Sequence, residues 1–579
     1  MSQQAPQGPV ATELDTDNEY CIIEAPHPHE PVETMRERIE RVREDLKNIT
    51  TFYNIDISPA RNARLQEYYD DELAELGTLP FDLYDQEEKI DYLLLRNHLE
   101  RNVRQLQLDA IKNEKIEPLL PFAATIIRLC QDRQEVKPMD AQRAAQDVHE
   151  VGKRVAELGQ SVKAKKMRVD KTSAFRAAKI VDRLRLHLRE WFGFYDGYDP
   201  MFTWWVAQPF AETEALLELY AATIREFLVG IKSGDEQSAI VGDPIGHDGL
   251  VAELRAEKIP YTPDEVLRIG EKEYAWCEKE MKKASRELGH GDDWRAALEY
   301  VKTLHVEPGK QTQLVKDLSK EATDYVTKRD LITVPALAAE TIPMYMMSPE
   351  RQMANPFFLG GDAIIVSYPT NTMSHEAKMM SMRGNNVHFS RSTVFHELIP
   401  GHHLQLFMNA RHRAYRRMFE TCFSIEGWAF HWEMILWDDE KFPKTAENRI
   451  GMLFWRMHRC CRIMFSIKFH LGKKTSEECI DLLVNKGGHE RATAEGEVRR
   501  SFAGDYPPLY PAGYMLGALQ LYSLRQELVG GGMIREKEFH DRIMREGQMP
   551  IELLRALLKK QALTPDHKAA WRFYDRSEN

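Results

Sequence analysis

Residues 392–405, with the sequence STVFHELIPGHHLQ, constrain the fold and the chemistry of this chain more than any other stretch. A His-Glu pair followed by further histidines is typical of a zinc-hydrolase helix, in which two imidazoles bind the metal and the glutamate activates a water molecule. Here His396 and Glu397 form the pair, and His402 and His403 follow. The stretch therefore predicts a metal-binding helix with Glu397 as the general base.

The spacing of these histidines differs from the usual one. The second ligand normally lies four residues after the first, ~40° around the helix and ~6 Å along it, whereas Pro400 holds that position here. On an unbroken helix His402 would point roughly 240° away from His396, and His403 would share its face about 10 Å further along. Proline distorts a helix, so a looped-out Pro400-Gly401 would make His402 the second ligand, whereas a simple bend would select His403. We favour His402 and keep His403 as the alternative.

A third metal ligand is expected from a separate helix, and Glu426 is the candidate. It opens the segment EGWAFHWE and lies 24 residues after His402, which leaves room for a turn and a helix running back. Two histidines and one glutamate favour zinc, although cobalt, manganese and iron also accept such a set in part. The sequence therefore predicts one zinc ion per chain.

A zinc hydrolase also needs a donor for the developing oxyanion and often a cation for a substrate carboxylate. The polar stretch from residue 489 to residue 514 offers both kinds of side chain. Its candidates are Tyr510, Tyr514, Arg499 and Arg500, of which we assign Tyr514 and Arg500 to the catalytic site.

The composition restricts the class of protein. With 43% hydrophobic and 29% charged residues, the 579-residue chain is expected to be soluble and globular, and its net charge of −12 argues against nucleic acid as a partner. No apolar run approaches the ~18 residues that a membrane span needs. Residues 1–30 lack a basic region and an apolar core, so we expect a flexible tail and no signal peptide. The seven cysteines are scattered, as in reduced proteins, which favours a cytoplasmic location.

Most of the chain has the pattern of helices. Apolar residues recur at three- and four-residue steps between many charges from about residue 31 to residue 228, and Thr262, Pro263 and Glu265 form a helix start with a capping box. Residues 331–335 and 363–368 are rich in β-branched side chains, and residues 386–390 alternate. We therefore expect a mostly helical protein with a small β-sheet just before the metal helix.

The motifs HELIPGHH and EGWAFHWE, the helix start YTPDEV and the ending FHD…GQMP together resemble the family catalogued as domain of unknown function 885, over roughly residues 31 to 557. The resemblance implies a fold similar to the gluzincin oligopeptidases and the angiotensin-converting-enzyme-like peptidases, with a deep cleft between two helical lobes. It implies that His396, Glu397, His402 or His403, and Glu426 supply the metal ligands and the base. The region of Tyr514 would form the far wall of the cleft. Dipeptidyl peptidase III is a partial precedent, because its motif also carries an insertion between the two ligands.

We accordingly expect a helical N-terminal lobe over residues 31–340 and a metal-site lobe over residues 341–579, acting as one functional unit. The first functional hypothesis is a zinc-dependent hydrolase that cleaves an amide or peptide bond in a small peptide or amino-acid conjugate. The second keeps the metal but runs a lyase, dehydratase or cyclase reaction on a small biosynthetic metabolite. The third is a helical binding protein without metal, because Pro400 occupies the usual ligand position. The oligomeric state does not follow from the sequence.

Overall fold

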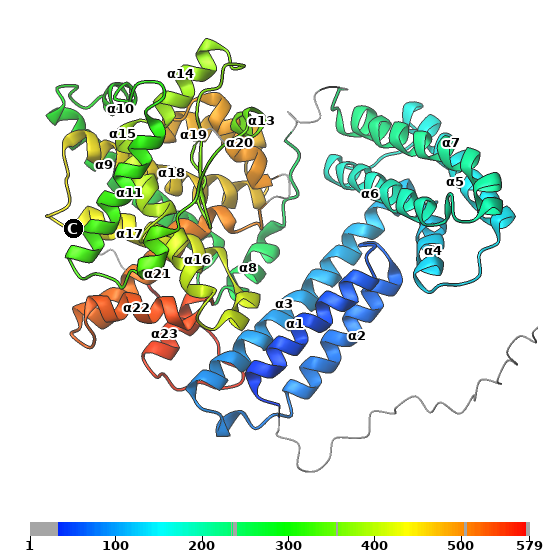
Figure 1. The fold of residues 1–579 in the computed structure, drawn as a ribbon, viewed down its shortest axis with the longest axis horizontal. Helices are drawn as coiled ribbons and strands as arrows, with labels where there is room; N and C mark the ends of the chain where they lie inside the picture. The colour runs from blue at the N-terminus through cyan, green and yellow to red at the C-terminus, as the bar shows by residue number, and fades with distance from the viewer. Residues whose placement is uncertain (1–32, 233, 235–239, 355–356, 503–505, 575–579) are drawn as a thin grey trace, which may run out of the picture.

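Helices make up nearly all of the regular structure in the computed structural model, as the sequence predicted (Figure 1). The structure describes residues 33–232, 234, 240–354, 357–502 and 506–574. The expected tail over residues 1–30 lies outside these described residues, and so does Cys21. Among the described helices, none combines the length and the apolar character that a membrane span requires.

The first three helices form an N-terminal group: α1 (Met35–Phe52), α2 (Pro59–Leu76) and α3 (Gln86–Ile116). Capping boxes start α1 and α3, where Thr34 and Asp85 each accept a hydrogen bond from a backbone N–H. Leu94, near the start of α3, lies in the large core that also contains Leu404 and Phe423, whereas Ile116 at its end lies in a separate core. The long helix α3 therefore joins two packed units.

The second core belongs to a distal bundle, which is built from α4 (Ala123–Gln134), α5 (Ala141–Lys163), α6 (Lys171–Tyr195) and α7 (Pro200–Ile224). Figure 1 shows this bundle at the far end of α3 from the remaining helices. Its core includes the aromatic rings of Trp191, Phe202 and Tyr220. The aromatic stretch around Trp191 thus packs the bundle.

The remaining helices form the main body. They are α8 (Gly246–Ala256), α9 (Pro263–Glu287), α10 (Trp294–Lys302), α11 (Gln311–Lys328), α12 (Ala336–Glu340), α13 (Pro349–Ala354), α14 (His375–Gly384), α15 (Val387–Glu397), α16 (His402–Asn409), α17 (Cys422–Asp438), α18 (Ala446–His470), α19 (Ser476–Gly487), α20 (Arg491–Phe502), α21 (Tyr510–Arg525), α22 (Glu536–Glu546) and α23 (Ile551–Leu558). Short 3₁₀ and π segments are η1 (Phe81–Leu83), η2 (Glu117–Leu119), η3 (Arg225–Val229), η4 (Ala414–Phe419) and η5 (Gln526–Gly530).

The chain passes from the core of the distal bundle to the core of the main body before residue 340, where we expected the boundary between the two lobes. Leu250, Val266 and Ala338 all lie in the large core of the main body, and α9 packs along α18. Residues from about 246 onward therefore belong with the main body.

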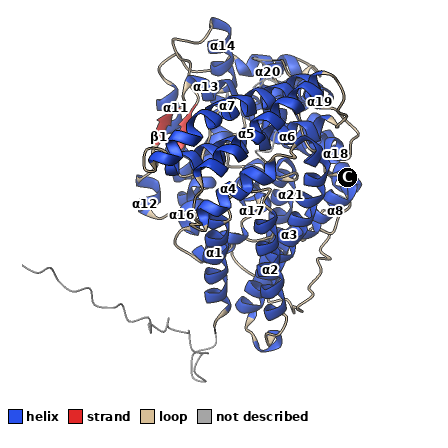
Figure 2. Ribbon diagram, turned by 90° about the vertical axis from the view of Figure 1, so that its right-hand side faces the viewer, coloured by secondary structure: helices blue, strands red, loops and turns tan. Residues whose placement is uncertain are grey.

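β1 (Met344–Met346) and β2 (Ile364–Val366), drawn in red in Figure 2, form a parallel two-stranded sheet. Ile364 and Val366 share a small core with Val394 and Phe395 of α15, which confirms a small sheet at this place. The strands expected at residues 331–335 and 386–390 were wrong. Asn386 is a helix N-cap that accepts hydrogen bonds from two backbone N–H groups, so the alternating residues after it begin α15.

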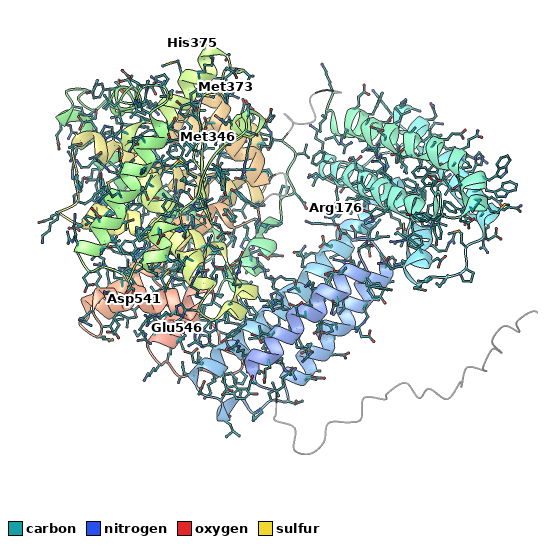
Figure 3. The ribbon with its side chains drawn as sticks, viewed as in Figure 1. Arg176, Met346, Met373, His375, Asp541 and Glu546 are labelled. Atoms are coloured by element: carbon teal, nitrogen blue, oxygen red, sulfur yellow. The ribbon has the colours of Figure 1, made fainter. Side chains whose placement is uncertain are left out.

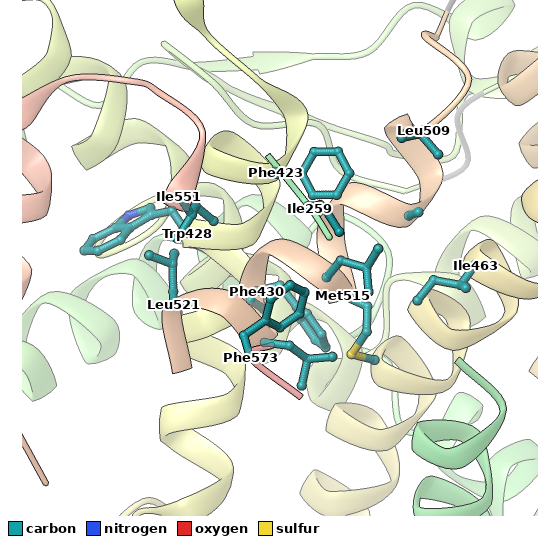
Figure 4. Close-up of a cluster of buried hydrophobic side chains, with 14 of the residues drawn as sticks. Ile259, Phe423, Trp428, Phe430, Ile463, Leu509, Met515, Leu521, Ile551 and Phe573 are labelled. Atoms are coloured by element: carbon teal, nitrogen blue, oxygen red, sulfur yellow. The ribbon is translucent and has the colours of Figure 1, made fainter. Parts of the chain in front are cut away.

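The centre of the main body is the packing of α17, α18 and α21, shown in Figure 4. Phe423 and Phe430 of α17 and Met515 of α21 lie in this core. The two helix backbones approach closely where Gly517 meets α17, because a Cβ atom on Gly517 would lie 2.1 Å from the carbonyl oxygen of Phe423. A side chain at this position would force α17 and α21 apart.

We therefore predict that Gly517→Ala lowers the free energy of unfolding by about 1–3 kcal/mol, the usual cost of overpacking a close-packed core. Gly193→Ala is the matched control, because Gly193 lies on an exposed face of α6 with open space around its Cβ position. Alanine favours helix over glycine, so the control is expected to unfold at the native temperature or slightly above it. Equal thermal unfolding midpoints for the two variants would contradict the close contact.

Candidate metal centre

The two histidine ligand candidates lie on separate helices. Helix α15 ends at Glu397 and α16 begins at His402, and residues 398–401 leave the helix between them, with a cis peptide bond before Pro400. Gly401 contacts the last turn of α15, where a Cβ atom would lie 1.8 Å from the carbonyl oxygen of His396. Only glycine permits so close an approach of one backbone to another. The break predicted from Pro400 is thus larger than a two-residue loop, and it turns α16 back beside the end of α15.

The break brings His396, His402 and Glu426 together in the interior. One possible ligand atom of each residue lies within 4.8 Å of the others. Glu426 Oε2 is 3.4 Å from His396 Nε2 and 3.1 Å from His402 Nε2. Atoms bound to one zinc ion at ~2 Å lie no more than ~4 Å apart, so the two separations from Glu426 fit a shared divalent cation. All three side chains are buried.

His403, the alternative ligand, is placed elsewhere. Its Nε2 lies 3.0 Å from the carbonyl oxygen of Ala338, and the side chain is buried. Between the two alternatives, the geometry favours His402.

Glu433 orients the first histidine. His396 Nδ1 lies 2.9 Å from Glu433 Oε1, and this hydrogen bond directs Nε2 towards Glu426. Glu433 lies seven residues after Glu426 on α17, and two turns bring both carboxylates to one helix face. The sequence analysis passed over this residue, although the two acids at this spacing in EGWAFHWE could have revealed it.

Acidic neighbours favour positive charge on His396 in the three-residue cluster. Burial opposes protonation of His396, but the hydrogen bonds to Glu426 and Glu433 outweigh it and raise the pKa to about 9. Burial likewise opposes the charge of Glu426, yet the positive field of His402 and the hydrogen bond to His396 hold the pKa of its carboxyl well below the usual range. A site that holds a proton this strongly between carboxylates also favours a metal cation.

The predicted base, Glu397, lines the same cavity as the three candidate ligands. Its carboxylate lies against the backbone of Gly360, where a Cβ atom would be 2.0 Å from Glu397 Oε2. Gly360 follows Leu359, whose backbone pairs with Ile365 in β2. The small sheet therefore fixes the wall against which the base lies.

Two tyrosines of the predicted polar stretch reach the cluster from α21. The Tyr510 hydroxyl donates a hydrogen bond to Glu426 Oε1. The Tyr514 ring lies nearly parallel to the His396 ring, with 5.9 Å between ring centres. Burial and the nearby Glu426 charge raise the pKa of Tyr514 well above its usual value, so its hydroxyl stays protonated and can donate.

The arginines are arranged differently from the prediction. Arg500 lines the cavity but donates to Glu497 Oε2, whereas Arg499 is not among the residues that line this cavity. Glu497 Oε1 also accepts a hydrogen bond from Arg462 of α18, at 2.6 Å. Burial disfavours the Glu497 charge, but the two guanidinium groups outweigh it and lower the pKa of the carboxyl to about 2.

Helix α18 supplies two lining cations that the sequence analysis missed, Arg459 and Arg462. With Arg456 they recur every three residues in a helix that is otherwise largely apolar and buried. Arginines at helical spacing in such a helix must find partners inside the protein. The three arginines at three-residue spacing could therefore have indicated a charged internal site.

The cluster lies in a cavity of about 220 Å³, lined by side chains from α15–α18, α20 and α21 and by residues 357–360. A second cavity of about 760 Å³ lies next to it, and Tyr506 lines both. The lining of the second cavity includes Arg176 of α6 in the distal bundle. Figure 3 shows Arg176 on the side of the bundle that faces the main body. The two cavities thus adjoin at Tyr506.

Comparisons with known proteins agree with this fold. A sequence model of a family described as "Bacterial protein of unknown function (DUF885)" matches residues 54–558. A structure from Shewanella oneidensis, described as a "putative lipoprotein of unknown function", has 16% identity and a TM-score of 0.66 and covers 91% of this chain and 100% of its own. A structure described as a "putative lipoprotein" from Colwellia psychrerythraea has 15% identity and a TM-score of 0.59, with coverage of 91% and 99%. At such identities the likeness concerns the fold alone. Among curated proteins, none matches in sequence.

We predict that the native chain, purified without chelators, holds about one zinc ion, measured by inductively coupled plasma mass spectrometry. His396→Ala, His402→Ala and Glu426→Ala should each lose the metal, because two remaining ligands bind zinc weakly. His403→Ala should retain it, since Nε2 of His403 faces the Ala338 carbonyl. Zinc retained in all four variants would rule out this ligand set.

Glu433→Gln tests the orienting hydrogen bond separately. Loss of the charge behind His396 is expected to weaken zinc binding by about 10- to 100-fold, measured by competition with a chromophoric chelator. Glu440→Gln, an exposed residue beyond the end of α17, is the matched control and should bind zinc like the native protein. Equal zinc affinity in both variants would show that Glu433 does not support the ligand.

Proposed function

This chain belongs to the DUF885 family, and we propose that it is a zinc-dependent hydrolase that cleaves an amide or peptide bond in a small peptide or amino-acid conjugate. The observation that carries the proposal is the placement of the Glu397 carboxylate in one cavity with His396, His402 and Glu426. A proton acceptor beside a three-residue metal-ligand set is the arrangement that metal-assisted hydrolysis requires. A two-lobed architecture similar to that of the gluzincin peptidases is part of this proposal.

His396, His402 and Glu426 would hold the metal. When bound, a zinc ion supplies the Lewis acidity that makes water a better nucleophile and a carbonyl a better electrophile. Glu397 accepts a proton from the attacking water on its carboxylate. It then delivers that proton to the nitrogen of the leaving amine as the carbon–nitrogen bond breaks.

Tyr514 is the proposed donor to the substrate carbonyl oxygen. Its hydroxyl stays protonated because burial and the Glu426 charge raise its pKa. A donor placed before the reaction stabilises the charge that develops on that oxygen, and removal of one such donor typically costs about 10²–10³ in rate. Tyr510 has a different role, since it donates to Glu426 and holds that ligand in place.

The size of the cavity supports a small substrate. About 220 Å³ of space lies at the proposed metal site, and a larger cavity lined in part by α3, α6 and α8 adjoins it at Tyr506. A folded protein does not fit such a space, whereas a short peptide or an acylated amino acid does.

We predict that Glu397→Gln retains zinc but lowers kcat for hydrolysis by about 10²- to 10⁴-fold, the usual contribution of a general base. The assay is mass spectrometry of products from a library of short acylated peptides in ¹⁸O-labelled water. Glu376→Gln, which changes an exposed glutamate of α14, should keep native activity. Turnover without incorporation of ¹⁸O would refute hydrolysis and support the lyase, dehydratase or cyclase hypothesis.

A further inference from the structure

Arg459 and Arg462 of α18 lie against the Tyr514 ring, which separates them from the proposed ligand His396. The Arg462 and Arg459 guanidinium carbons are 4.3 and 5.2 Å from the centre of the Tyr514 ring, which itself lies 5.9 Å from the His396 ring. These distances place the Arg462 guanidinium within about 10 Å of the His396 ring. Both arginines line the cavity that contains the proposed metal ligands.

Arg459 is buried, and its guanidinium lies over the rings of Phe430, Trp455 and Tyr514. Its side chain is only 7% exposed, and among the described residues its Nε has no hydrogen-bond acceptor. The carboxylate that faces it is Glu433, at 3.6 Å from Nη2, which is longer than a hydrogen bond. Glu433 Oε1 already accepts from His396. A buried cation with unused donors is costly unless something in the cavity supplies oxygen acceptors.

The neighbouring pair of arginines binds a common carboxylate. Glu497 accepts a hydrogen bond from Arg462 on one oxygen and from Arg500 on the other. Nε of Arg462 is the atom bound to Glu497, so its terminal Nη groups can bind a second acceptor.

The charges around the whole cavity also favour the binding of an anion once a metal is present. Its described lining residues include the three arginines 459, 462 and 500 and the four glutamates 397, 426, 433 and 497. A divalent cation at the proposed ligands would change the sum to one net positive charge. The loaded cavity would therefore attract an anion, and its unused guanidinium donors lie on the α18 side.

We propose that Arg459 and Arg462 bind a free carboxylate of the substrate, so that the bond cleaved lies within two residues of the carboxyl end of a short peptide or acylated amino acid. A guanidinium presents donors in the planar arrangement that a carboxylate matches. Residues along an extended chain are ~3.8 Å apart, so one or two of them span the distance from the ligands to these arginines. This inference rests on the proposed hydrolase function.

The test compares matched acids and amides. A library of N-acetyl dipeptides is prepared with free carboxylates and again with carboxamide ends, and kcat and KM are measured for both sets. The native zinc-loaded enzyme should prefer the acids by about 10- to 100-fold in kcat/KM, because the amides lose charged hydrogen bonds. Arg459→Met and Arg462→Met should each reduce this preference towards one, mainly through KM.

Two further variants separate binding from structural effects. Arg459→Lys keeps the charge without the planar fork and should restore part of the preference. Arg449→Met, on α18 but outside the cavity, should leave the preference unchanged. An unchanged acid preference in zinc-loaded Arg459→Met, together with weaker zinc binding, would overturn the inference, because Arg459 would then act only by positioning Glu433.

A binding measurement keeps this test independent of catalysis. The same acids and amides are titrated by calorimetry into the zinc-loaded Glu397→Gln variant, which should bind without turnover. A preference for acids that Arg459→Met removes would support the carboxylate site even if no amide were hydrolysed by the native enzyme. Equal binding of acids and amides, or binding of neither, would overturn it, whereas the hydrolase proposal depends on turnover alone.

Discussion

The proposed metal centre depends on the contact between Gly401 and the last turn of α15. Because a Cβ atom at residue 401 would lie 1.8 Å from the His396 carbonyl oxygen, the chain can fold back there only with glycine. The Trp428 indole N–H donates to the carbonyl oxygen of Pro400, at 2.9 Å, in the buried interior. Trp428 belongs to α17, two residues after Glu426. One hydrogen bond therefore ties the turn between the two histidines to the helix that carries the carboxylate, and the positions of all three side chains are coupled.

A second close approach supplies the tyrosines. Gly517 lets the backbones of α17 and α21 come into contact, and this brings Tyr510 to Glu426 and Tyr514 to the ring of His396. Side chains larger than hydrogen at this contact would move α21 and its hydroxyl groups away from the cluster. The buried charges are satisfied in the same region, since Glu497 lies between two guanidinium groups. Burying charges is expensive unless partners are close, so the packing of the helices and the pairing of the charges support each other.

The sequence predicted the elements of the site better than their arrangement. The HELIPGHH motif identified the helix that carries His396, and Pro400 indicated its break, because proline acts locally on the backbone. Glu433, Arg459 and Arg462 were missed because helical spacing defines a face without saying what that face meets. The packing of α9 against α18 was not foreseen for a similar reason, since only tertiary structure joins these two helices. The strand expected at residues 386–390 failed because five alternating residues are a weak signal beside the N-cap Asn386.

The pairing of charges differs between the two cavities, and this difference indicates where a substrate anion would bind. Two cations of the larger cavity have close carboxylates, Glu253 at 2.6 Å from Arg101 and Asp109 at 3.0 Å from Arg176. Arg459 in the smaller cavity has its carboxylate further away, at 3.6 Å, and among the described residues its Nε has no acceptor. A substrate carboxylate would thus gain most at α18, which would hold the adjoining amide beside Glu397 and the proposed metal ligands.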